Sequence, residues 1–90
     1  MVGVEKMATR IRKMLYKALC EREEGKEYTR TLREISFLAM QVDEQCKEQY
    51  GFLVFFYRLK LLPLLSYKDF RTLIFDLMGM IERGEVDGIK

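Results

Sequence analysis

Apolar side chains recur every three or four residues in three separate stretches of the chain, and this spacing is the strongest constraint on its fold. Because an α-helix turns once in 3.6 residues, such a stretch predicts a helix with one apolar face. The spacing predicts helices over about residues 4–24, 31–49 and 67–83. Gly25 and Gly84 follow the first and the last of them, at the position where glycine commonly ends a helix.

Two helix starts carry a capping pattern, in which a hydroxyl residue precedes an acidic residue by three positions. Thr31 precedes Glu34, and Ser66 precedes Asp69, so Thr31 and Ser66 are the predicted N-caps. Within the second predicted helix the apolar residues step by three and four, which is typical of helices that pack lengthwise. This seam consists of Leu32, Ile35, Ala39, Val42 and Cys46.

Residues 52–62, FLVFFYRLKLL, are almost continuously apolar. Aromatic and β-branched residues favour a strand by propensity. However, the chain offers no second strand candidate, and a lone strand has nothing to pair with. The segment is therefore predicted to form a short helix that ends before Pro63. Its length and the charges of Arg58 and Lys60 argue against a membrane span, which needs about 20 apolar residues.

Four helical segments joined by short connections predict an all-α fold, a small three- or four-helix antiparallel bundle. A chain of 90 residues is expected to form a single domain, residues 1–90. Residues 85–90 contain only two isolated apolar side chains and are expected to form a loose tail.

The residues needed for common enzyme mechanisms are missing. The chain contains no histidine, which excludes Ser–His and Cys–His nucleophilic pairs, and its six glycines are too scattered for a phosphate-binding loop. Glu44 and Glu48 lie one helical turn apart, but no second pair of carboxylates completes a helical metal site. The sequence therefore predicts a protein that is not an enzyme and that has no metal or cofactor.

Two further features concern the setting in which the chain works. Cys20 and Cys46 lack the partners of a four-ligand metal site, so they are either buried apolar residues or the two halves of a disulfide. Glutamate and lysine together number 18 and asparagine is absent, which is typical of hyperthermophilic proteins. An archaeal or archaeal-virus source is expected. The charged N-terminus does not resemble a signal peptide, which predicts a cytoplasmic protein.

The chain has more large apolar side chains than one small core needs. Phe37 and Met40 lie opposite the seam of the second predicted helix, where polar residues are usual. Either this helix is sandwiched between two layers, or its second face meets a partner. Together with Phe52, Phe55 and Phe56 they are the predicted protein interface. The expected function is that of a small interaction module, of an adaptor or inhibitor kind, that forms a homodimer.

A basic ridge on the first helix gives an alternative. Lys6, Arg10, Lys13 and Lys17 fall within an arc of about 60° at 100° per residue. Such a ridge matches the phosphates of a nucleic acid backbone, although an ordinary solvated helix face has the same composition.

A second alternative comes from residues 49–56, QYGFLVFF. Gln49, Phe52, Phe55 and Phe56 fall on the positions of the clamp-binding peptide of replication proteins, which this segment resembles. The resemblance implies that the glutamine enters a polar pocket and that the apolar residues fill a hydrophobic groove of a sliding clamp. Phe52 departs from the motif, because leucine, isoleucine or methionine is usual there. The competing interpretation is a core helix with buried aromatics.

Overall fold

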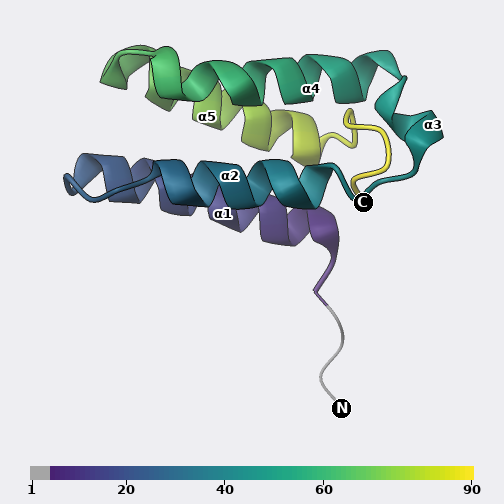
Figure 1. The fold of residues 1–90 in the computed structure, drawn as a ribbon, viewed down its shortest axis with the longest axis horizontal. Helices are drawn as coiled ribbons and strands as arrows, with labels where there is room; N and C mark the ends of the chain where they lie inside the picture. Colours follow the sequence, from purple (N-terminus) through teal and green to yellow (C-terminus); the bar gives the residue numbers. More distant parts are fainter. Residues whose placement is uncertain (1–4) are drawn as a thin grey trace.

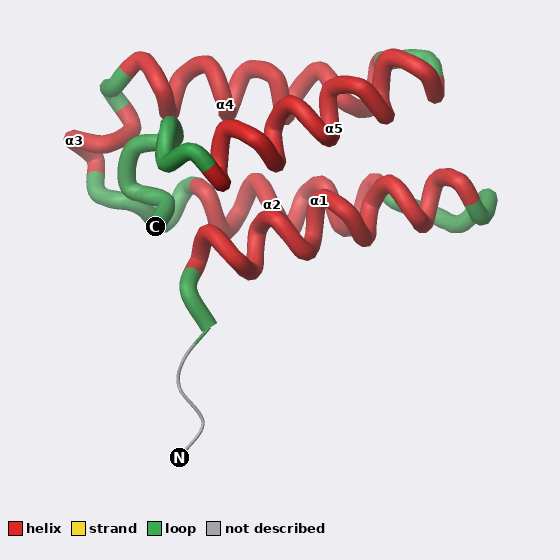
Figure 2. The backbone as a smooth tube through the Cα atoms, turned by 180° about the vertical axis from the view of Figure 1, so that it is seen from behind, coloured by secondary structure: helices red, strands yellow, loops and turns green. Residues whose placement is uncertain are grey.

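Four long helices run alternately in opposite directions around a shared core. The computed structural model of the chain describes residues 5–90 (Figure 1). In Figures 1 and 2, one antiparallel pair, α1 and α2, lies beside a second pair, α4 and α5. Each long helix packs against two others, since α1 and α4 both contact α2 and α5. The elements are α1 (Met7–Glu23), α2 (Thr29–Ala39), α3 (Glu44–Lys47), α4 (Tyr50–Leu61), the 3₁₀ turn η1 (Leu62–Leu64) and α5 (Tyr67–Glu82).

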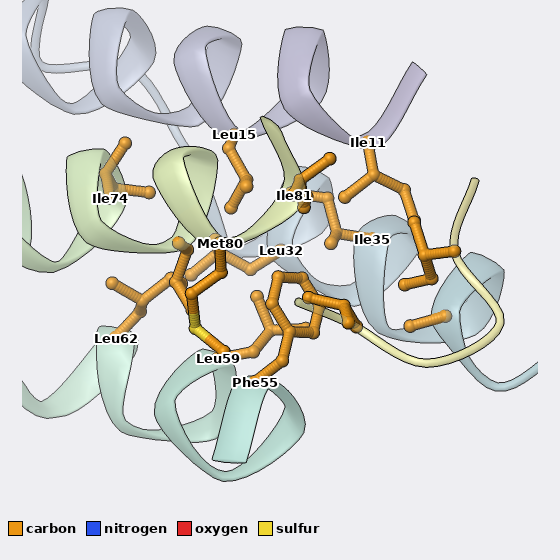
Figure 3. Close-up of a cluster of buried hydrophobic side chains, with 14 of the residues drawn as sticks. Ile11, Leu15, Leu32, Ile35, Phe55, Leu59, Leu62, Ile74, Met80 and Ile81 are labelled. Atoms are coloured by element: carbon orange, nitrogen blue, oxygen red, sulfur yellow. The ribbon is translucent and has the colours of Figure 1, made fainter. Parts of the chain in front are cut away.

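The predicted all-α antiparallel bundle is confirmed, with no strand among residues 5–90. The core lies between the two helix pairs and takes side chains from all four long helices (Figure 3). Burial of each such side chain stabilises the fold by about 1.5–3 kcal/mol. The side chains labelled in Figure 3 are Ile11, Leu15, Leu32, Ile35, Phe55, Leu59, Leu62, Ile74, Met80 and Ile81.

Three of the four predicted helices are found within a few residues of their predicted bounds. They are α1, α4 and α5; residue 4, the predicted start of the first helix, lies outside the described residues. Gly25 and Gly84 have φ angles of +73° and +68°, so both take the left-handed conformation that ends a helix. None of the helices in the part of the chain that the structure describes is long and apolar enough to cross a membrane.

The predicted second helix over residues 31–49 is wrong. Helix α2 ends at Ala39, and the chain turns through residues 40–43 before the separate short helix α3. Val42 is nevertheless buried, because the end of the chain covers it. A Cβ atom at Gly88 would stand only 2.8 Å from the Cβ of Val42. Packing against a distant segment, and not the helical period, therefore fixes the position of these residues.

The predicted N-cap role of Thr31 is also wrong. Helix α2 starts two residues earlier, and Thr31 is buried within it. Its hydroxyl donates a hydrogen bond of 2.5 Å to Oε1 of Glu21, which ties α2 to α1. The second predicted cap is confirmed, because Oγ of Ser66 accepts a hydrogen bond of 3.4 Å from the backbone N–H of Asp69.

The predicted loose tail over residues 85–90 is wrong as well. Val86 and Ile89 are each only 2% exposed, and they pack into the core. The N–H of Ala8 donates a hydrogen bond of 3.1 Å to the carbonyl oxygen of Lys90. Residues 83–90, here called the C-terminal strap, thus close the end of the bundle where α1 begins (Figure 1). The two apolar residues lie three positions apart on a tight turn, in which the Ile89 N–H donates to the Val86 carbonyl, so both face inward.

Candidate interaction surfaces

Helix α4 is apolar on two opposite sides. Its inner side buries Phe52, Phe55 and Leu59 in the core. Its outer side leaves large apolar residues in solvent, with exposed fractions of 82% for Tyr50, 53% for Leu53, 66% for Tyr57 and, just beyond the helix, 80% for Leu64. A helix that is apolar all round is normally covered on all sides.

Tyr50, Leu53 and Tyr57 line one surface, and Leu64 lies just beyond it on η1. A groove of about 600 Å³ runs between α4 and α5. We call the apolar α4 side of this surface the α4 face; it comprises Tyr50, Leu53, Val54, Tyr57, Leu61 and Leu64. Arg58 is the one charged residue among those that line the groove, and its Nη1 lies 3.6 Å from the sulfur of Met80. The α4 face therefore offers apolar contact with little charge.

The predicted interface is wrong for Phe52 and Phe55, which are buried within the chain, at 2% and 0% exposure. Phe56 is half-buried and stacks on Phe52 with 5.7 Å between ring centroids. Tyr50, Leu53 and Tyr57 were not among the interface residues predicted from the sequence. The only available signal was their helical phase, which places them opposite Phe52 and Phe55 but does not say which side faces inward.

The clamp-peptide resemblance does not correspond to an exposed surface in this fold. Gln49 is exposed and immediately precedes α4. Phe52 and Phe55 point into the core, and only Phe56 is partly accessible. These residues could not enter a groove on another protein while α4 keeps its place in the bundle.

A second surface lies on the opposite helix pair. Arg10 and Met14 of α1 face residues of α2 across an open groove of about 780 Å³. Phe37, a residue of the predicted interface, is 70% exposed and lines this groove. Met40 is also exposed, but it does not line the groove. The residues from α2 and the turn after it are Arg30, Arg33, Glu34, Phe37, Leu38 and Gln41; with Arg10 and Met14 they form the α1–α2 groove.

The predicted basic ridge is exposed, but one of its four side chains already forms an ion pair within the chain. Lys6, Arg10, Lys13 and Lys17 are all exposed. The ammonium group of Lys13 lies 3.0 Å from Oε2 of Glu5 and forms an ion pair with it. Among the four residues, Arg10 alone lines the α1–α2 groove.

At the other end of the bundle, the Arg22 guanidinium stacks on aromatic rings. Its Cζ lies 4.7 Å from the ring centroid of Phe70, 5.2 Å from that of Tyr28 and 6.0 Å from that of Tyr67. This cation–π packing holds the start of α5 against α1. Partial removal from water raises the pKa of Tyr67, and a hydrogen bond to Glu23 acts in the same direction. The guanidinium is held by these rings, and its buried Nη1 has no hydrogen-bond partner within residues 5–90.

No group of three histidine, cysteine or acidic side chains within residues 5–90 is arranged to hold a metal ion. Cys20 and Cys46 are free thiols and half-buried, so the structure has no disulfide between them. Glu44 forms an ion pair of 2.8 Å with Lys47.

No protein-family model, curated protein or solved structure matches the chain.

Proposed function

We propose that the chain is a small non-catalytic interaction module that forms a homodimer through the α4 face. The observation that carries this proposal is the outer side of α4, where four large apolar side chains are exposed in the single chain. Contiguous exposed apolar patches of this kind mark protein interfaces in soluble proteins. The proposed interface differs from the one predicted from the sequence, which consisted of Phe37, Met40, Phe52, Phe55 and Phe56. Phe52 and Phe55 are buried in the core, and Phe37 lies on the other helix pair.

The size of the α4 face agrees with what a stable dimer requires. A fully exposed aromatic side chain carries about 150–250 Å², so Tyr50 and Tyr57 together present roughly 300 Å². The exposed side chains of Leu53 and Leu64 add to this apolar surface. A standard interface buries about 800 Å² on each partner, of which roughly 56–65% is apolar. The apolar share needed for a dimer is therefore present on one face of a single chain.

The spacing of the face suits a two-fold axis. Tyr57 lies seven residues after Tyr50 and seven before Leu64. Antiparallel pairing of two α4 helices, with the axis opposite Tyr57, brings Tyr50 of one protomer beside Leu64 of its partner. Viewed down the axis of α4, Arg58 and Lys60 lie about 80° to either side of Tyr50. Their charges therefore remain at the solvated edge of the proposed interface. Two-fold dimers are the commonest closed assemblies.

Replacement of both Leu53 and Tyr57 by glutamate is expected to convert the dimer into a monomer. Dimerisation would bury four unpaired carboxylates, which costs several kcal/mol. The dissociation constant should rise at least about 100-fold. Sedimentation velocity at micromolar concentration measures the change, since the wild-type protein should sediment at twice the chain mass of 10.8 kDa and the variant at the chain mass.

Phe37→Glu is the matched control for this experiment. Phe37 is equally exposed but lies on the opposite helix pair, so this variant should remain a dimer. Circular dichroism verifies that each variant stays helical. A wild-type protein that sediments at the chain mass contradicts the proposal, and so does a Phe37→Glu variant that alone dissociates.

We further propose that the module works in the cytoplasm of a hyperthermophilic archaeon or of a virus that infects one. The excess of glutamate and lysine supports a high working temperature, and two free thiols suit a reducing compartment. The purified protein should then unfold above about 90 °C. Differential scanning calorimetry tests this, and a midpoint in the range of about 45–65 °C, which is usual for mesophilic domains, contradicts it.

A further inference from the structure

We infer that the α1–α2 groove is a second binding site, which receives an acidic amphipathic helix from another protein. The groove is lined by residues of α1, α2 and the turn after α2, whereas the α4 face belongs to the other helix pair, so the two surfaces share no residue. Figure 1 shows the two helix pairs side by side. The inference goes beyond the proposed dimer and does not depend on it.

The apolar part of the groove is built around Phe37. This ring is 70% exposed, although it stands in the middle of the groove-lining side of α2. Met14 from α1 and Leu38 from α2 are half-buried beside it and form an apolar floor. The groove volume of about 780 Å³ accommodates several side chains of a partner.

The charges around this floor select the partner. Arg10, Arg30 and Arg33 line the groove against one carboxylate, Glu34. Glu34 lies 3.8 Å from Nε of Arg30. Within residues 5–90, Arg10 and Arg33 form no ion pair. Two arginines are thus free to hold carboxylates, which guanidinium groups bind through paired hydrogen bonds.

The same charges argue against a second copy of the chain as the occupant. Two such grooves facing each other would bring at least two unpaired arginines from each protomer together, and like charges at an interface are unfavourable. A partner with carboxylates around an apolar stripe is complementary to the apolar floor of the groove and to its positive charge.

The length of the groove sets the length of the partner segment. On α2 the lining residues run from Arg30 to Leu38, or about 12 Å at the helical rise, and Gln41 in the turn after α2 extends the groove further. A partner helix of about three turns spans this distance, with apolar residues at i, i+4 and i+7 toward the floor. Its aspartate or glutamate residues should flank that stripe, within reach of Arg10 and Arg33.

A nucleic acid fits the groove less well than such a helix. A phosphate backbone leaves the floor around Phe37 uncovered, and Glu34 repels it. Of the basic ridge, Lys13 is already paired with Glu5, and a single exposed aromatic gives little stacking.

Fluorescence anisotropy with the full chain tests the inference. The probe is a labelled synthetic helix of about 15 residues, with leucines at i, i+4 and i+7 and glutamates on both flanks. It should bind saturably and weaken as salt is raised. The same peptide with lysines in place of the glutamates should not bind. A labelled DNA duplex of about 20 base pairs is the third probe.

The variants assign the binding to the groove. Phe37→Ala and Arg33→Glu should each weaken acidic-peptide binding roughly tenfold or more. Arg71→Glu, an exposed charge reversal on α5, should leave it unchanged. The α4-face variant with Leu53→Glu and Tyr57→Glu should bind like the wild type, which separates this site from the proposed dimer. The inference is overturned if the acidic peptide does not bind, if the lysine peptide binds equally well, or if only DNA binds.

Discussion

Replacement of Phe55 by alanine is expected to lower the free energy of unfolding by about 3–5 kcal/mol. Phe55 is fully buried and lies beside Leu59 in the core between the helix pairs (Figure 3). Its loss would leave a cavity that the surrounding helices can close only in part. Since a small domain has about 5–15 kcal/mol in total, the variant should melt markedly lower, by about 4–8 °C for each kcal/mol. Guanidinium unfolding followed by circular dichroism measures the change.

The neighbouring aromatic is the control for this experiment. Phe56 is half-buried, stacks on Phe52 and lies 4.9 Å from the ammonium group of Lys60. Phe56→Ala should cost only about 1–2 kcal/mol. In the clamp-binding peptide both aromatics are binding residues, and neither is expected to support the fold. Equal small losses for the two variants would therefore contradict the core position of Phe55.

Two of the three helices that were predicted well from the sequence, α1 and α5, have ends that are defined locally. Ser66 caps α5 through the N–H of Asp69, three residues away, and Gly25 and Gly84 end their helices through their own backbone conformation. Each of these contacts joins residues within a single helical turn. A pattern in a short stretch of sequence is enough to predict them.

The errors concern residues whose position depends on distant parts of the chain. The seam over residues 31–49 is equally compatible with one long helix and with a helix that breaks after Ala39. What decides between them is the contact of Val42 with Gly88, which are 46 positions apart. The same contact explains why the predicted loose tail is packed.

The two surfaces show how far a single-sequence pattern can locate a site. For α2 the pattern places Phe37 opposite the buried seam, but only the structure shows that no second layer covers this side. For α4 the pattern is ambiguous, since Tyr57 and Phe55 lie on opposite sides and both are apolar. The α1–α2 groove could not be predicted, because Arg10 and Arg33 line the same groove only as a result of the antiparallel packing of α1 against α2.

Removal of residues 86–90 is expected to destabilise the protein by an amount comparable to its whole stability. The deletion takes Val86 and Ile89 out of the core, and loss of one large aliphatic side chain alone costs about 2–5 kcal/mol. It also exposes Val42 and leaves the N–H of Ala8 without its acceptor, the carbonyl of Lys90. The truncated chain should be largely unfolded or should melt tens of degrees lower, which thermal unfolding by circular dichroism measures.

Point variants in the strap separate the contribution of its buried side chains to stability from that of its backbone. Ile89→Ala, which keeps the backbone hydrogen bonds, should cost about 2–5 kcal/mol, whereas Lys90→Ala changes an exposed side chain and should cost within about 0.5 kcal/mol. Amide hydrogen exchange gives an independent measure, because the N–H of Ile89 should be protected by the turn it forms with Val86. If the strap only lay on the surface, the N–H of Ile89 would exchange freely, and the two variants would have the same free energy of unfolding. We expect protection of the Ile89 N–H and a stability difference between the two variants, because the strap supplies buried side chains to the same core as α1 and α2.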